Sequence, residues 1–345
     1  MKNKTMIQRW LPVLLIAALS FVSLTGCGTS NTQTSSSGTS PAPSLTSVRL
    51  GLMANSDGAY LAAVAEDQGY FTKYGIKVET STFSAGINTV DAITLGQLDI
   101  GYVADFAALN RFGSSEKSDL RIFAKISSSN SKNTKLYVAK DIASLADLKG
   151  KGIVTQKGTV FEYWIAKALE KAGLTQNDVN LLPVGSSQEG IAIMESGQAS
   201  ADWGFGQSAQ KLEASGKFNV LITQADVASA TLAFSIANAS YLKDNQLAVE
   251  GYLKAMNDAV AFVKQNPDQA ADIVLSKQNT PKETTLAQFK SVTYDVNFKQ
   301  DTVDALDDIY TWIEKNGSLK SKYNLRDYID INALNTALPG SVDYK

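Results

Sequence analysis

Apolar and polar residues follow two different spacings in the first part of the folded region. In residues 75–80 they alternate one by one, the period of a strand with one buried face, whereas residues 59–68 repeat apolar side chains every three or four positions, the period of a helix. Gly69 and Gly96 stand where two such helices would end. The pattern predicts a strand at 47–52, a helix at 59–68, a strand at 75–80, a helix at 87–95 and a strand at 98–103.

Short connections between these elements predict a doubly wound α/β sheet, in which strands alternate with covering helices. Ligands of such sheets bind outside the carboxyl ends of the strands. The residues that follow the three strands should therefore share one rim, at Asn55–Gly58, Ser84–Gly86 and Ala104–Phe106.

The same alternation starts again at residue 135. It predicts strands at 135–139, 152–156, 180–184, 199–205 and 218–222, helices at 160–172 and 187–195, and a further strand at 232–237. From Ser240 onward the chain becomes helical, with two long amphipathic stretches, Val249 to Val263 and Val303 to Ile313. The folded region thus divides into two α/β units and a helical C-terminal part.

The first residues have the composition of an export signal. Lys2, Lys4 and Arg9 precede an apolar run, Leu11–Leu24, of about fourteen residues. As a helix this run would span only ~21 Å of a ~30 Å bilayer core. We therefore expect a cleaved signal peptide at 1–26 rather than a permanent membrane helix.

The single cysteine follows this run directly. Leu24-Thr25-Gly26-Cys27 resembles the bacterial lipobox, in which a peptidase cuts before the cysteine and a lipid is attached to its sulfur. This implies a protein held on the membrane through Cys27; the alternative is an uncleaved anchor with an ordinary cysteine. Residues 28–45 are dominated by Gly, Ser, Thr, Asn and Pro, so we expect a disordered tether at 27–45.

Composition excludes several classes of function. The chain has 32 basic and 34 acidic residues, and the first 26 residues hold three of the basic ones and no acidic one, so the remainder has a formal net charge of −5. No dense basic stripe indicates nucleic-acid binding. With no histidine and one cysteine, the usual nucleophiles and transition-metal ligands are missing, and no disulfide forms within one chain. We expect a binding protein without metal or cofactor rather than an enzyme.

Several segments together resemble the nitrate/sulfonate/taurine substrate-binding proteins of ABC transporters. They are EDQGYF (66–71) with YGIKV (74–78), AITLGQLDIG (92–101), SLADLKGK (144–151) with KGT (157–159) and ALEKAGL (168–174), and ESGQASADW (195–203). The resemblance covers about residues 47–240 and depends on the order and spacing of these segments.

This resemblance implies a type II periplasmic-binding-protein fold, an α/β fold of two lobes joined by two hinge crossovers. Lobe I would comprise 46–132 plus 233–345, and lobe II would comprise 133–232. Such proteins capture a small-molecule solute outside the cytoplasm, close around it, and deliver it to an ABC permease with its ATPase subunit. We expect a monomer, and because the chain has no Walker-type loop we expect no ATP hydrolysis by the chain itself.

In lobe II the candidate ligand-binding residues lie at a predicted helix start. They are Lys157, Gly158, Thr159, Val160 and Phe161. The free N–H groups of a first helical turn suit an anion, Gly158 lets the backbone approach a ligand, and Lys157 adds a positive charge. Thr159 and Glu162 have capping-box spacing, so the alternative is a plain helix cap with a solvated lysine.

In lobe I the loops after the strands supply the candidates. They are Ser56, Asp57, Gly58, Ser84, Ala85, Gly86, Asp105 and Phe106. Residues 84–86 precede a helix and offer a second set of N–H groups, with a bare loop as the alternative. Asp57 is either a helix cap or a ligand partner. Asp105 would pair with an amine, latch the lobes or cap the next helix, and it would repel a simple anion unless turned away.

Aromatic residues of lobe II are candidate walls of the site, namely Phe161, Trp203 and Phe205. An aromatic face contributes apolar area at a low cost in rotamer entropy, and it can hold a cation. Trp164 instead falls at a core position of its predicted helix. Glu189 would contact the ligand or serve as a favourable first-turn acid of the helix at 187–195.

These residues leave the ligand open. The main hypothesis is a small organic anion such as an aliphatic sulfonate or a taurine-like compound, although Gly204-Phe205-Gly206 departs from the Trp- and Pro-containing stretch common in sulfonate binders. The alternatives are an aromatic heterocycle such as a thiamine-precursor pyrimidine, or nitrate. An enzyme is a further alternative, but the pyrimidine-synthesising relatives of this fold use a histidine, which this chain lacks. The last alternative is a surface sensor that signals to a kinase whether a ligand is bound.

Overall fold

The structure is a computed structural model that describes residues 45–114, 118–129, 132–316 and 319–344. The expected signal peptide, Cys27 and all but the last residue of the expected tether lie outside the described residues. All of the described residues belong to one compact unit, Pro43–Lys345.

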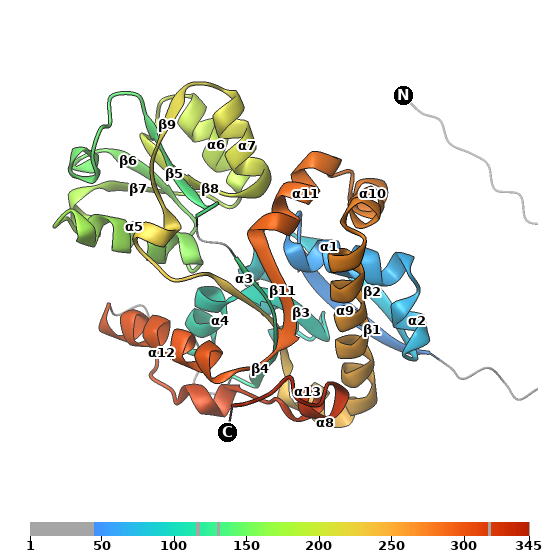
Figure 1. Cartoon of the computed structure of the whole chain (residues 1–345). Helices are drawn as coiled ribbons and strands as arrows, with labels where there is room; N and C mark the ends of the chain where they lie inside the picture. The colour runs from blue at the N-terminus through green and yellow to red at the C-terminus, as the bar shows by residue number, and fades with distance from the viewer. Residues whose placement is uncertain (1–44, 115–117, 130–131, 317–318, 345) are drawn as a thin grey trace, which may run out of the picture. The chain divides into compact units, whose positions relative to one another are not determined.

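The first sheet has six strands in the order β11-β4-β10-β3-β1-β2 (Figure 1). They are β1 (Thr46–Met53), β2 (Ile76–Phe83), β3 (Ile100–Ala104), β4 (Leu120–Ser129), β10 (Leu232–Asn238) and β11 (Val292–Asn297). β1 pairs in parallel with β2 and β3, whereas β10 runs antiparallel to β3 and β4. The carboxyl ends of β1, β2 and β3 therefore meet at one edge of this sheet.

The second sheet has five strands in the order β7-β6-β8-β5-β9. They are β5 (Lys135–Ala139), β6 (Gly152–Thr155), β7 (Asn180–Pro183), β8 (Ala201–Gly204) and β9 (Phe218–Thr223). β6 pairs in parallel with β7 and β8, and β5 runs antiparallel to β8 and β9. Each sheet is the centre of one lobe: lobe I is built on the first sheet and lobe II on the second.

The chain passes between the two sheets twice. It leaves β4 after Ser129 and returns to β10 at Leu232. The crossovers are hydrogen-bonded to each other, because the Ser129 N–H donates to the Thr231 carbonyl at 2.9 Å and the Thr231 N–H donates to Ser129 Oγ at 3.0 Å. The two-lobed α/β fold with two crossovers is thus confirmed, while the residue boundaries of the lobes stay a prediction.

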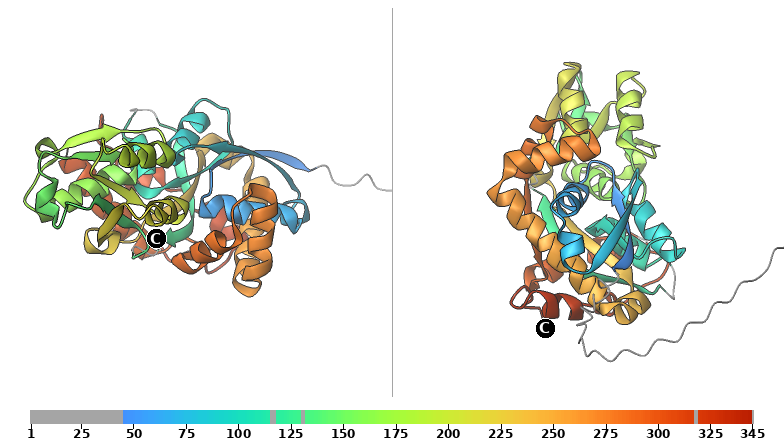
Figure 2. Two further views of the ribbon diagram at one scale, coloured as in Figure 1. Left: turned by 90° about the horizontal axis from the view of Figure 1, so that it is seen from above. Right: turned by 90° about the vertical axis from the view of Figure 1, so that its right-hand side faces the viewer.

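Helices cover both sheets (Figure 1, Figure 2). Around the first sheet lie α1 (Asp57–Asp67), α2 (Tyr70–Lys73), α3 (Gly86–Thr94), α4 (Asp105–Phe112), α8 (Ala239–Asp244), α9 (Gln246–Gln265), α10 (Pro267–Gln278), α11 (Lys282–Ser291), α12 (Gln300–Lys315) and α13 (Asn332–Ala337). The second sheet is flanked by α5 (Val160–Lys171), α6 (Ser187–Glu195) and α7 (Gly206–Ala214). Short 3-10 turns occur at Leu145–Leu148, Gln176–Asp178, Gln224–Asp226 and Leu325–Tyr328.

Two apolar clusters hold these elements together. The larger one joins the core of lobe I to the α5 side of lobe II, and it includes Phe106, Trp164 and Trp203. The smaller one lies on the α6 and α7 side of lobe II and consists of Tyr137, Val154, Ile191, Met194, Ala199, Ala209 and Leu212. The α5 side of lobe II therefore packs in the same apolar core as lobe I, whereas its α6 and α7 side has a core of its own.

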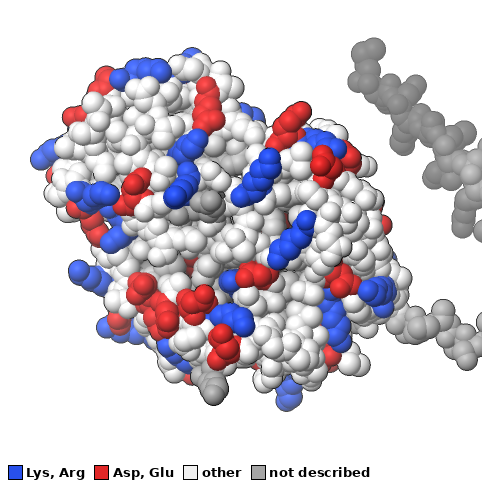
Figure 3. Space-filling model, in the orientation of Figure 1, with Lys and Arg blue, Asp and Glu red and all other residues white. Residues whose placement is uncertain are grey.

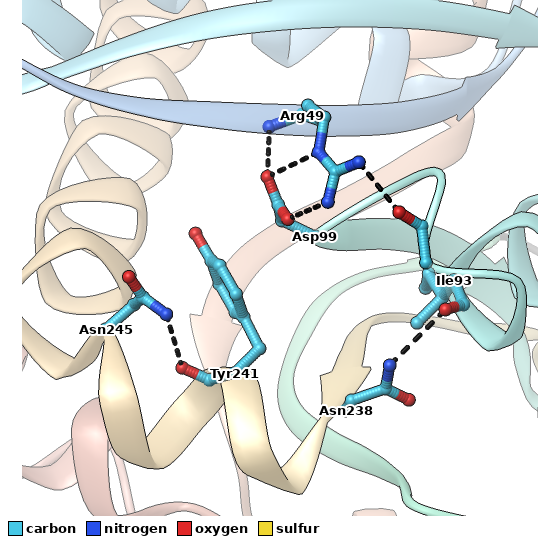
Figure 4. Close-up of polar contacts among 7 residues, drawn as sticks. Arg49, Ile93, Asp99, Asn238, Tyr241 and Asn245 are labelled. Carbon is cyan, nitrogen blue, oxygen red and sulfur yellow. Dashed lines mark hydrogen bonds and ion pairs between the residues drawn. The ribbon is translucent and has the colours of Figure 1, made fainter.

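An ion pair fixes the edge of the first sheet that lies away from the carboxyl ends of β1 and β3 (Figure 4). Arg49 Nη2 lies 2.6 Å from Asp99 Oδ1, and Arg49 Nε donates to Asp99 Oδ2 at 3.1 Å. Arg49 Nη1 also donates to the Gly96 carbonyl at 2.7 Å. A two-point guanidinium–carboxylate contact restrains orientation as well as distance. The Arg49–Asp99 contact therefore fixes the position of β1 relative to the start of β3.

Most predicted elements agree with the structure to within a few residues. The helix expected at 187–195 coincides with α6, and the strand expected at 135–139 coincides with β5. The strand expected at 199–205 is shorter, because Phe205 is already the N-cap of α7, a helix that the sequence analysis did not assign. It also assigned no element to β4 or β11. β4 ends in Ser127–Ser129, a run with weak strand propensity that is held between two neighbouring strands.

Charges of both signs are mixed on the face of the molecule drawn in Figure 3, with acidic side chains gathered over α12. The acidic residues of α12 are Asp301, Asp304, Asp307, Asp308 and Glu314. Within the part of the chain that the structure describes, no helix combines the length and the apolar character needed to span a bilayer.

Candidate ligand-binding pocket

A pocket with a volume of about 360 Å³ is lined by residues of both lobes. Its size falls within the range of roughly 300–1,000 Å³ that is usual for small-molecule sites. Lobe I contributes Met53, Ala54, Asn55, Asp57, Ser84, Ala85, Gly86, Ile87, Tyr102, Val103, Ala104, Ala107, Ser127, Ala233, Gln288 and Val292. Lobe II contributes Gln156, Thr159, Val160, Phe161, Trp164, Ser187, Gln188, Ile191, Phe205, Gly206, Gln207, Ser208 and Lys211, and the crossovers add Ser129, Thr134 and Thr231.

Helices from both lobes begin at the wall of this pocket. Their first residues, which all line it, are Gly86 of α3, Val160 of α5, Ser187 of α6 and Gly206 of α7. The first N–H groups of a helix have no acceptor within the helix, and the helix dipole makes this end attractive to an anion. No side chain caps α3, so the N–H groups of Gly86 and Ile87 are free to bind a ligand.

The start of α5 differs from the predicted capping box. Thr159 Oγ1 accepts from the Phe161 N–H at 3.3 Å and donates to the Gln156 carbonyl at 2.6 Å. Glu162 Oε2 reaches one residue further back than expected and accepts from the Gly158 N–H at 2.9 Å. The cap therefore occupies the N–H groups of Gly158 and Phe161 but not that of Val160, a residue of the pocket lining.

Gly158 brings the two lobes into contact beside these helix starts. Its φ of +72° lies in the left-handed region, and a Cβ at this position would lie 2.8 Å from Ile87 Cδ1 of lobe I. The backbone conformation therefore favours glycine, and an added Cβ would in addition displace the end of the Ile87 side chain. The contact places the start of α5 next to the start of α3.

Asp57 is the only acidic side chain among the described residues that line the pocket. Its carboxylate accepts a hydrogen bond from Ser127 Oγ, which lies 2.8 Å from Tyr102 Oη. Burial raises the pKa of Asp57, whereas the hydroxyl donors Ser127 and Tyr102 and the N–H groups of Asp57 and Gly58 lower it. Gly58 lies against the Tyr102 ring, where a Cβ would come within 2.7 Å. Asp57 is thus held by neutral donors in the wall of the pocket.

Lys211 of α7 is the only basic side chain among the described residues of the lining, and it is exposed. It belongs to lobe II, whereas Asp57 belongs to lobe I. No cluster of three or more Asp, Glu or Cys side chains suited to a metal ion occurs within the described ranges. The pocket therefore combines two separated charges with many neutral donors.

Aromatic rings of lobe II form one wall. Phe161, Trp164 and Phe205 line the pocket, with ring centroids 5.3 Å apart for Phe161 and Trp164 and 6.0 Å apart for Phe161 and Phe205. Trp203, expected in this wall, is 1% exposed and lies behind Trp164, with ring centroids 5.6 Å apart. Trp203 Nε1 has no hydrogen-bond partner among the described residues. Trp164 belongs to the apolar core, as expected from the sequence, and it also lines the pocket.

The lobes also touch on two flanks of the pocket, and one flank is aromatic. Tyr163 of α5, Phe106 of α4 and Trp312 of α12 contact one another. The Tyr163 ring centroid lies 5.9 Å from that of Phe106 and 5.0 Å from that of Trp312, and the Phe106 and Trp312 centroids are 6.0 Å apart. Trp312 Nε1 donates to Glu170 Oε1 of α5 at 3.3 Å. Phe106, a sequence candidate for ligand contact, is fully buried in this flank and does not line the pocket.

The other flank, between α7 and α11, is polar. Thr284 Oγ1 of α11 donates to Gln210 Oε1 of α7 at 2.7 Å. Gln288 lies beside the start of α7, since a Cβ on Gly206 would come within 3.2 Å of Gln288 Oε1. The buried face of α11 consists of Thr284, Thr285 and Gln288. These contacts of α11 with α7 are polar.

The sequence candidates divide into two sets in the structure. Those that line the pocket are Asp57, Ser84, Ala85, Gly86, Thr159, Val160, Phe161 and Phe205. Those that lie outside its lining are Ser56, Gly58, Asp105, Phe106, Lys157, Gly158, Glu189 and Trp203. The role of each in ligand binding stays a prediction.

Ser56 and Glu189 take part in helix caps. Ser56 Oγ accepts from the Ala59 N–H at 3.2 Å, and Glu189 Oε2 accepts from the Gly185 N–H at 2.8 Å. Both side chains are therefore engaged at the starts of α1 and α6. Lys157 is exposed outside the lining.

Asp105 connects α4 to the second crossover. Its Oδ1 accepts from the Phe106 N–H at 2.7 Å, and its Oδ2 accepts from the Leu232 N–H at 2.8 Å. Burial raises the pKa of Asp105 to about 7, against these two backbone donors, which lower it. The carboxylate thus joins the start of α4 to the point where the chain re-enters the first sheet.

Several polar residues of the pocket were not selected from the sequence. Gln156 and Ser187 follow β6 and β7, so the rule that ligands bind at carboxyl ends, applied to the second sheet, would have found them. Ser127 and Gln288 come from β4 and α11, which had not been assigned. No local signal marks them.

Two kinds of comparison identify relatives in sequence. A sequence model of the NMT1/THI5-like family matches residues 58–270. A predicted binding protein of Brucella abortus is 27% identical over 252 residues, which cover 71% of this chain and 77% of that protein. A predicted aliphatic sulfonates-binding protein of Escherichia coli K12 is 25% identical over 208 residues, 59% of this chain and 63% of that protein.

Solved structures share the fold. The periplasmic aliphatic sulphonate binding protein of Escherichia coli superposes with a TM-score of 0.70 at 21% identity, covering 83% of this chain and 92% of that one. The alkanesulfonate-binding protein of Xanthomonas axonopodis bound to MOPS gives a TM-score of 0.71 at 17% identity, covering 84% and 100%.

The same fold also serves other roles. The periplasmic nitrate-binding protein of Synechocystis has a TM-score of 0.68 at 16% identity, covering 86% of this chain and 89% of that one. A desulfurization enzyme has a TM-score of 0.64 at 15% identity, covering 85% and 99%. Identities this low establish a common fold, and the ligand must be argued from this chain's own residues. The match over residues 58–270 spans most of the folded region, and the chain belongs to the NMT1/THI5-like family.

Proposed function

We propose that this chain is the solute-binding component of an ABC importer and that it takes a small organic anion, foremost an aliphatic sulfonate, into the pocket between its lobes. Family membership and the fold shared with sulphonate-binding proteins support this role. The protein would act outside the cytoplasm as a monomer, held by a lipid on Cys27, and would pass its solute to a permease with an ATPase subunit.

One observation carries the ligand class: helix N-termini from both lobes meet at a single pocket. An anion there would accept several first-turn N–H groups at once, and backbone donors lose little entropy when they bind. Because α3 belongs to lobe I while α5, α6 and α7 belong to lobe II, the bound anion would favour the closed arrangement of the lobes.

The apolar part of a sulfonate would lie against the aromatic wall. Phe161 and Phe205 flank the start of α5, so an alkyl chain attached to an anion at this start would be shielded from water. Nitrate has no such part, which makes it a less suitable ligand than an alkyl sulfonate for a pocket of this volume.

The aromatic wall also favours a second candidate, a heterocycle such as a thiamine-precursor pyrimidine. A flat ring would stack on Phe161 or Phe205, and its N–H groups would donate to Asp57. In this case the helix starts would contribute little, because the ring carries no anionic group.

We propose binding without chemistry. Ser127 lies beside an acid, but its hydroxyl is hydrogen-bonded to Asp57 and Tyr102 in the wall of lobe I rather than paired with a free base. Unchanged ligand recovered after long incubation with the protein is the expected result, and conversion of a bound sulfonate would contradict it.

Calorimetric titration with alkyl sulfonates, nitrate and an aminopyrimidine tests the ligand class. Sulfonates should bind and raise the free energy of unfolding, by about 2.7 kcal/mol at a hundredfold excess over Kd. Binding of the aminopyrimidine with no response to any sulfonate would replace the first candidate by the second.

A proline at position 86 tests the role of the α3 start directly. Proline is tolerated at the first position of a helix, and Ala85 has the extended conformation that precedes proline readily. Gly86→Pro should therefore keep α3 but delete one donor, weakening sulfonate binding about 10- to 100-fold. Gly86→Ala is the matched control, because its Cβ has room and its N–H remains. Equal affinities of the two variants would refute the role of this N–H.

A further inference from the structure

We propose that lobe I has a second binding site, a cavity between α1, β2 and α10 that takes a free aliphatic α-amino acid, and that an occupant there favours closure of the pocket between the lobes. The second site does not depend on the proposed function, but its effect on solute binding rests on that function.

The second cavity has a volume of about 260 Å³ and is lined by residues of lobe I alone. α1 packs against α10, and both lie with β2 on the right-hand side of lobe I in Figure 1. β2 is the outermost strand of the first sheet. The volume lies just below the usual range for drug-sized ligands, so it suits a smaller molecule. The lining consists of Leu52, Ala54, Asn55, Ala59, Ala62, Ala63, Glu66, Thr80, Thr82, Lys277 and Gln278.

The lining of the second cavity carries one charge of each sign. Lys277 Nζ of α10 lies 3.6 Å from Glu66 Oε2 of α1, and the two side chains are 36% and 59% exposed. An exposed pair at this distance is weak, so both groups can take a further partner. An α-amino acid carries its ammonium and its carboxylate on one carbon atom. It can therefore pair with both side chains at once, its ammonium with Glu66 and its carboxylate with Lys277.

The rest of the lining matches a short apolar side chain. Leu52 and the three alanines of α1 are buried and form an apolar floor. Thr80 and Thr82 stand at alternate positions of β2, on one face of the strand, and add hydroxyl groups at the exposed side. No aromatic ring of the described residues lines this cavity, so a flat ring would find no stacking partner. An aliphatic amino acid such as valine fits these features.

The second cavity shares a wall with the pocket between the lobes, because Ala54 and Asn55 line both. This turn joins β1 to α1, and Asn55 has a φ of +56°, in the left-handed region. Asn55 Oδ1 accepts from Thr280 Oγ1 at 3.1 Å. Gln278 Nε2 donates to the Ala59 carbonyl at 2.6 Å. An occupant would thus hold this turn and the end of α10 in place.

The end of α10 leads directly into α11, which forms the lobe I side of the polar flank. Lys282 at the start of α11 pairs with Asp272 of α10 at 2.9 Å, so the two helices are tied together. α11 contributes Gln288 to the pocket between the lobes and Thr284 to the hydrogen bond with α7. Fixing α10 therefore favours the arrangement in which α11 meets lobe II.

Calorimetric titration of the full chain with L-valine and two derivatives tests the ligand class. L-Valinamide keeps the ammonium and lacks the carboxylate, whereas N-acetyl-L-valine keeps the carboxylate and lacks the ammonium. Each should bind about 10-fold more weakly than L-valine, the loss expected for one charge-assisted hydrogen bond. Absence of L-valine binding, or equal affinities of the three compounds, would overturn the inference.

Variants test the location of the site. Glu66→Gln and Lys277→Gln should each weaken L-valine binding about 10-fold. Asp67→Asn is the matched control, because Asp67 is exposed beside Glu66 and lies outside the lining. Gly86→Pro should leave L-valine binding unchanged, since Gly86 lines only the pocket between the lobes. Weaker L-valine binding in Gly86→Pro but not in Glu66→Gln would move the amino acid to that pocket and overturn the inference.

Sulfonate binding measures the effect on closure. Saturating L-valine should lower the Kd of an alkyl sulfonate about 5-fold, and saturating sulfonate should lower the Kd of L-valine by the same factor. Thr280→Val removes the hydroxyl that donates to Asn55, so it should reduce this factor while both ligands still bind. An unchanged sulfonate Kd would overturn the effect on closure. If no sulfonate binds, the proposed function fails instead, and L-valine titration of Glu66→Gln still decides the second site.

Discussion

The two flanks of the pocket hold the lobes together by different means. On the α4–α5–α12 flank, Phe106, Tyr163 and Trp312 form an aromatic cluster that continues into the shared core. On the α7–α11 flank, the contacts include the Thr284–Gln210 hydrogen bond and the approach of Gln288 to α7.

This difference between the two flanks indicates which side of the pocket would open first. Separating aromatic rings exposes apolar area to water, at about 25 cal/mol per Å². Separating neutral hydrogen-bonding groups costs less, because water replaces each lost partner. The α7–α11 flank should therefore open first, with the aromatic flank acting as the pivot.

Asp105 offers the largest test of the aromatic flank, because its carboxylate joins α4 to the second crossover. Its folded-state pKa of about 7 lies above the unfolded value of 3.8, so the folded protein binds this proton more tightly. The stability it contributes is complete below about pH 4 and is lost as the pH rises to about 7, by up to about 4 kcal/mol. Urea unfolding of the wild type should show this decline, and Asp105→Asn should lack it. Parallel pH profiles of the two proteins would contradict the assignment.

Trp312 tests the pivot itself. Trp312→Ala removes the ring that packs against both Phe106 and Tyr163, so the free energy of unfolding should fall by about 2 kcal/mol. Trp312→Phe, which keeps a ring, should recover most of this loss. An unchanged urea midpoint for the alanine variant would show that the aromatic flank does not hold the lobes.

Gly158 tests the contact between the start of α5 and the start of α3. Gly158→Ala places a Cβ at positive φ and against Ile87, which should destabilise the closed arrangement by about 1–2 kcal/mol and weaken ligand binding accordingly. Adding Ile87→Ala should relieve the steric part and leave the backbone strain. Calorimetric affinities of the single and double variants measure the two parts, and additive effects would mean that the side chains do not meet.

Thr284 gives the smallest effect, on the flank expected to open. Thr284→Val removes a hydroxyl that donates to Gln210, at a cost of about 0.5–1 kcal/mol. Global stability should change little, whereas the ligand dissociation rate should rise a few-fold, as measured by stopped-flow exchange. Thr284→Ser keeps the donor and should behave as wild type. A loss of stability as large as that of Trp312→Ala would abolish the distinction between the flanks.

Local patterns were sufficient for most of the fold. Periodicity and glycine stops located α6 and the parallel strands because these elements carry their own hydrophobic pattern and end signals. The sequence pattern did not predict β4, because its serines are held in the sheet by β10 and β11, which are far away in sequence. A strand whose support is entirely non-local leaves a weak mark in its own residues.

The pocket was predictable only in part, for the same reason. The rule that ligands bind at the carboxyl ends of strands, together with the predicted helix starts, led to Asp57, Gly86 and Thr159. It could not show that Ser127 would meet Asp57, because that contact depends on the register of β4 in the sheet. Nor could it show that Trp164, expected in the core, would line the pocket in front of Trp203, which was expected in the wall.

The tryptophan arrangement gives the protein its own optical reporters. Trp164 faces the space that a solute would fill, Trp203 lies in a dry environment directly behind it, and Trp312 stands on the pivot. A bound solute would change the fluorescence emission of Trp164, whereas the emission of Trp312 would stay the same. Solute capture by this chain should thus be visible in ultraviolet light without any attached dye.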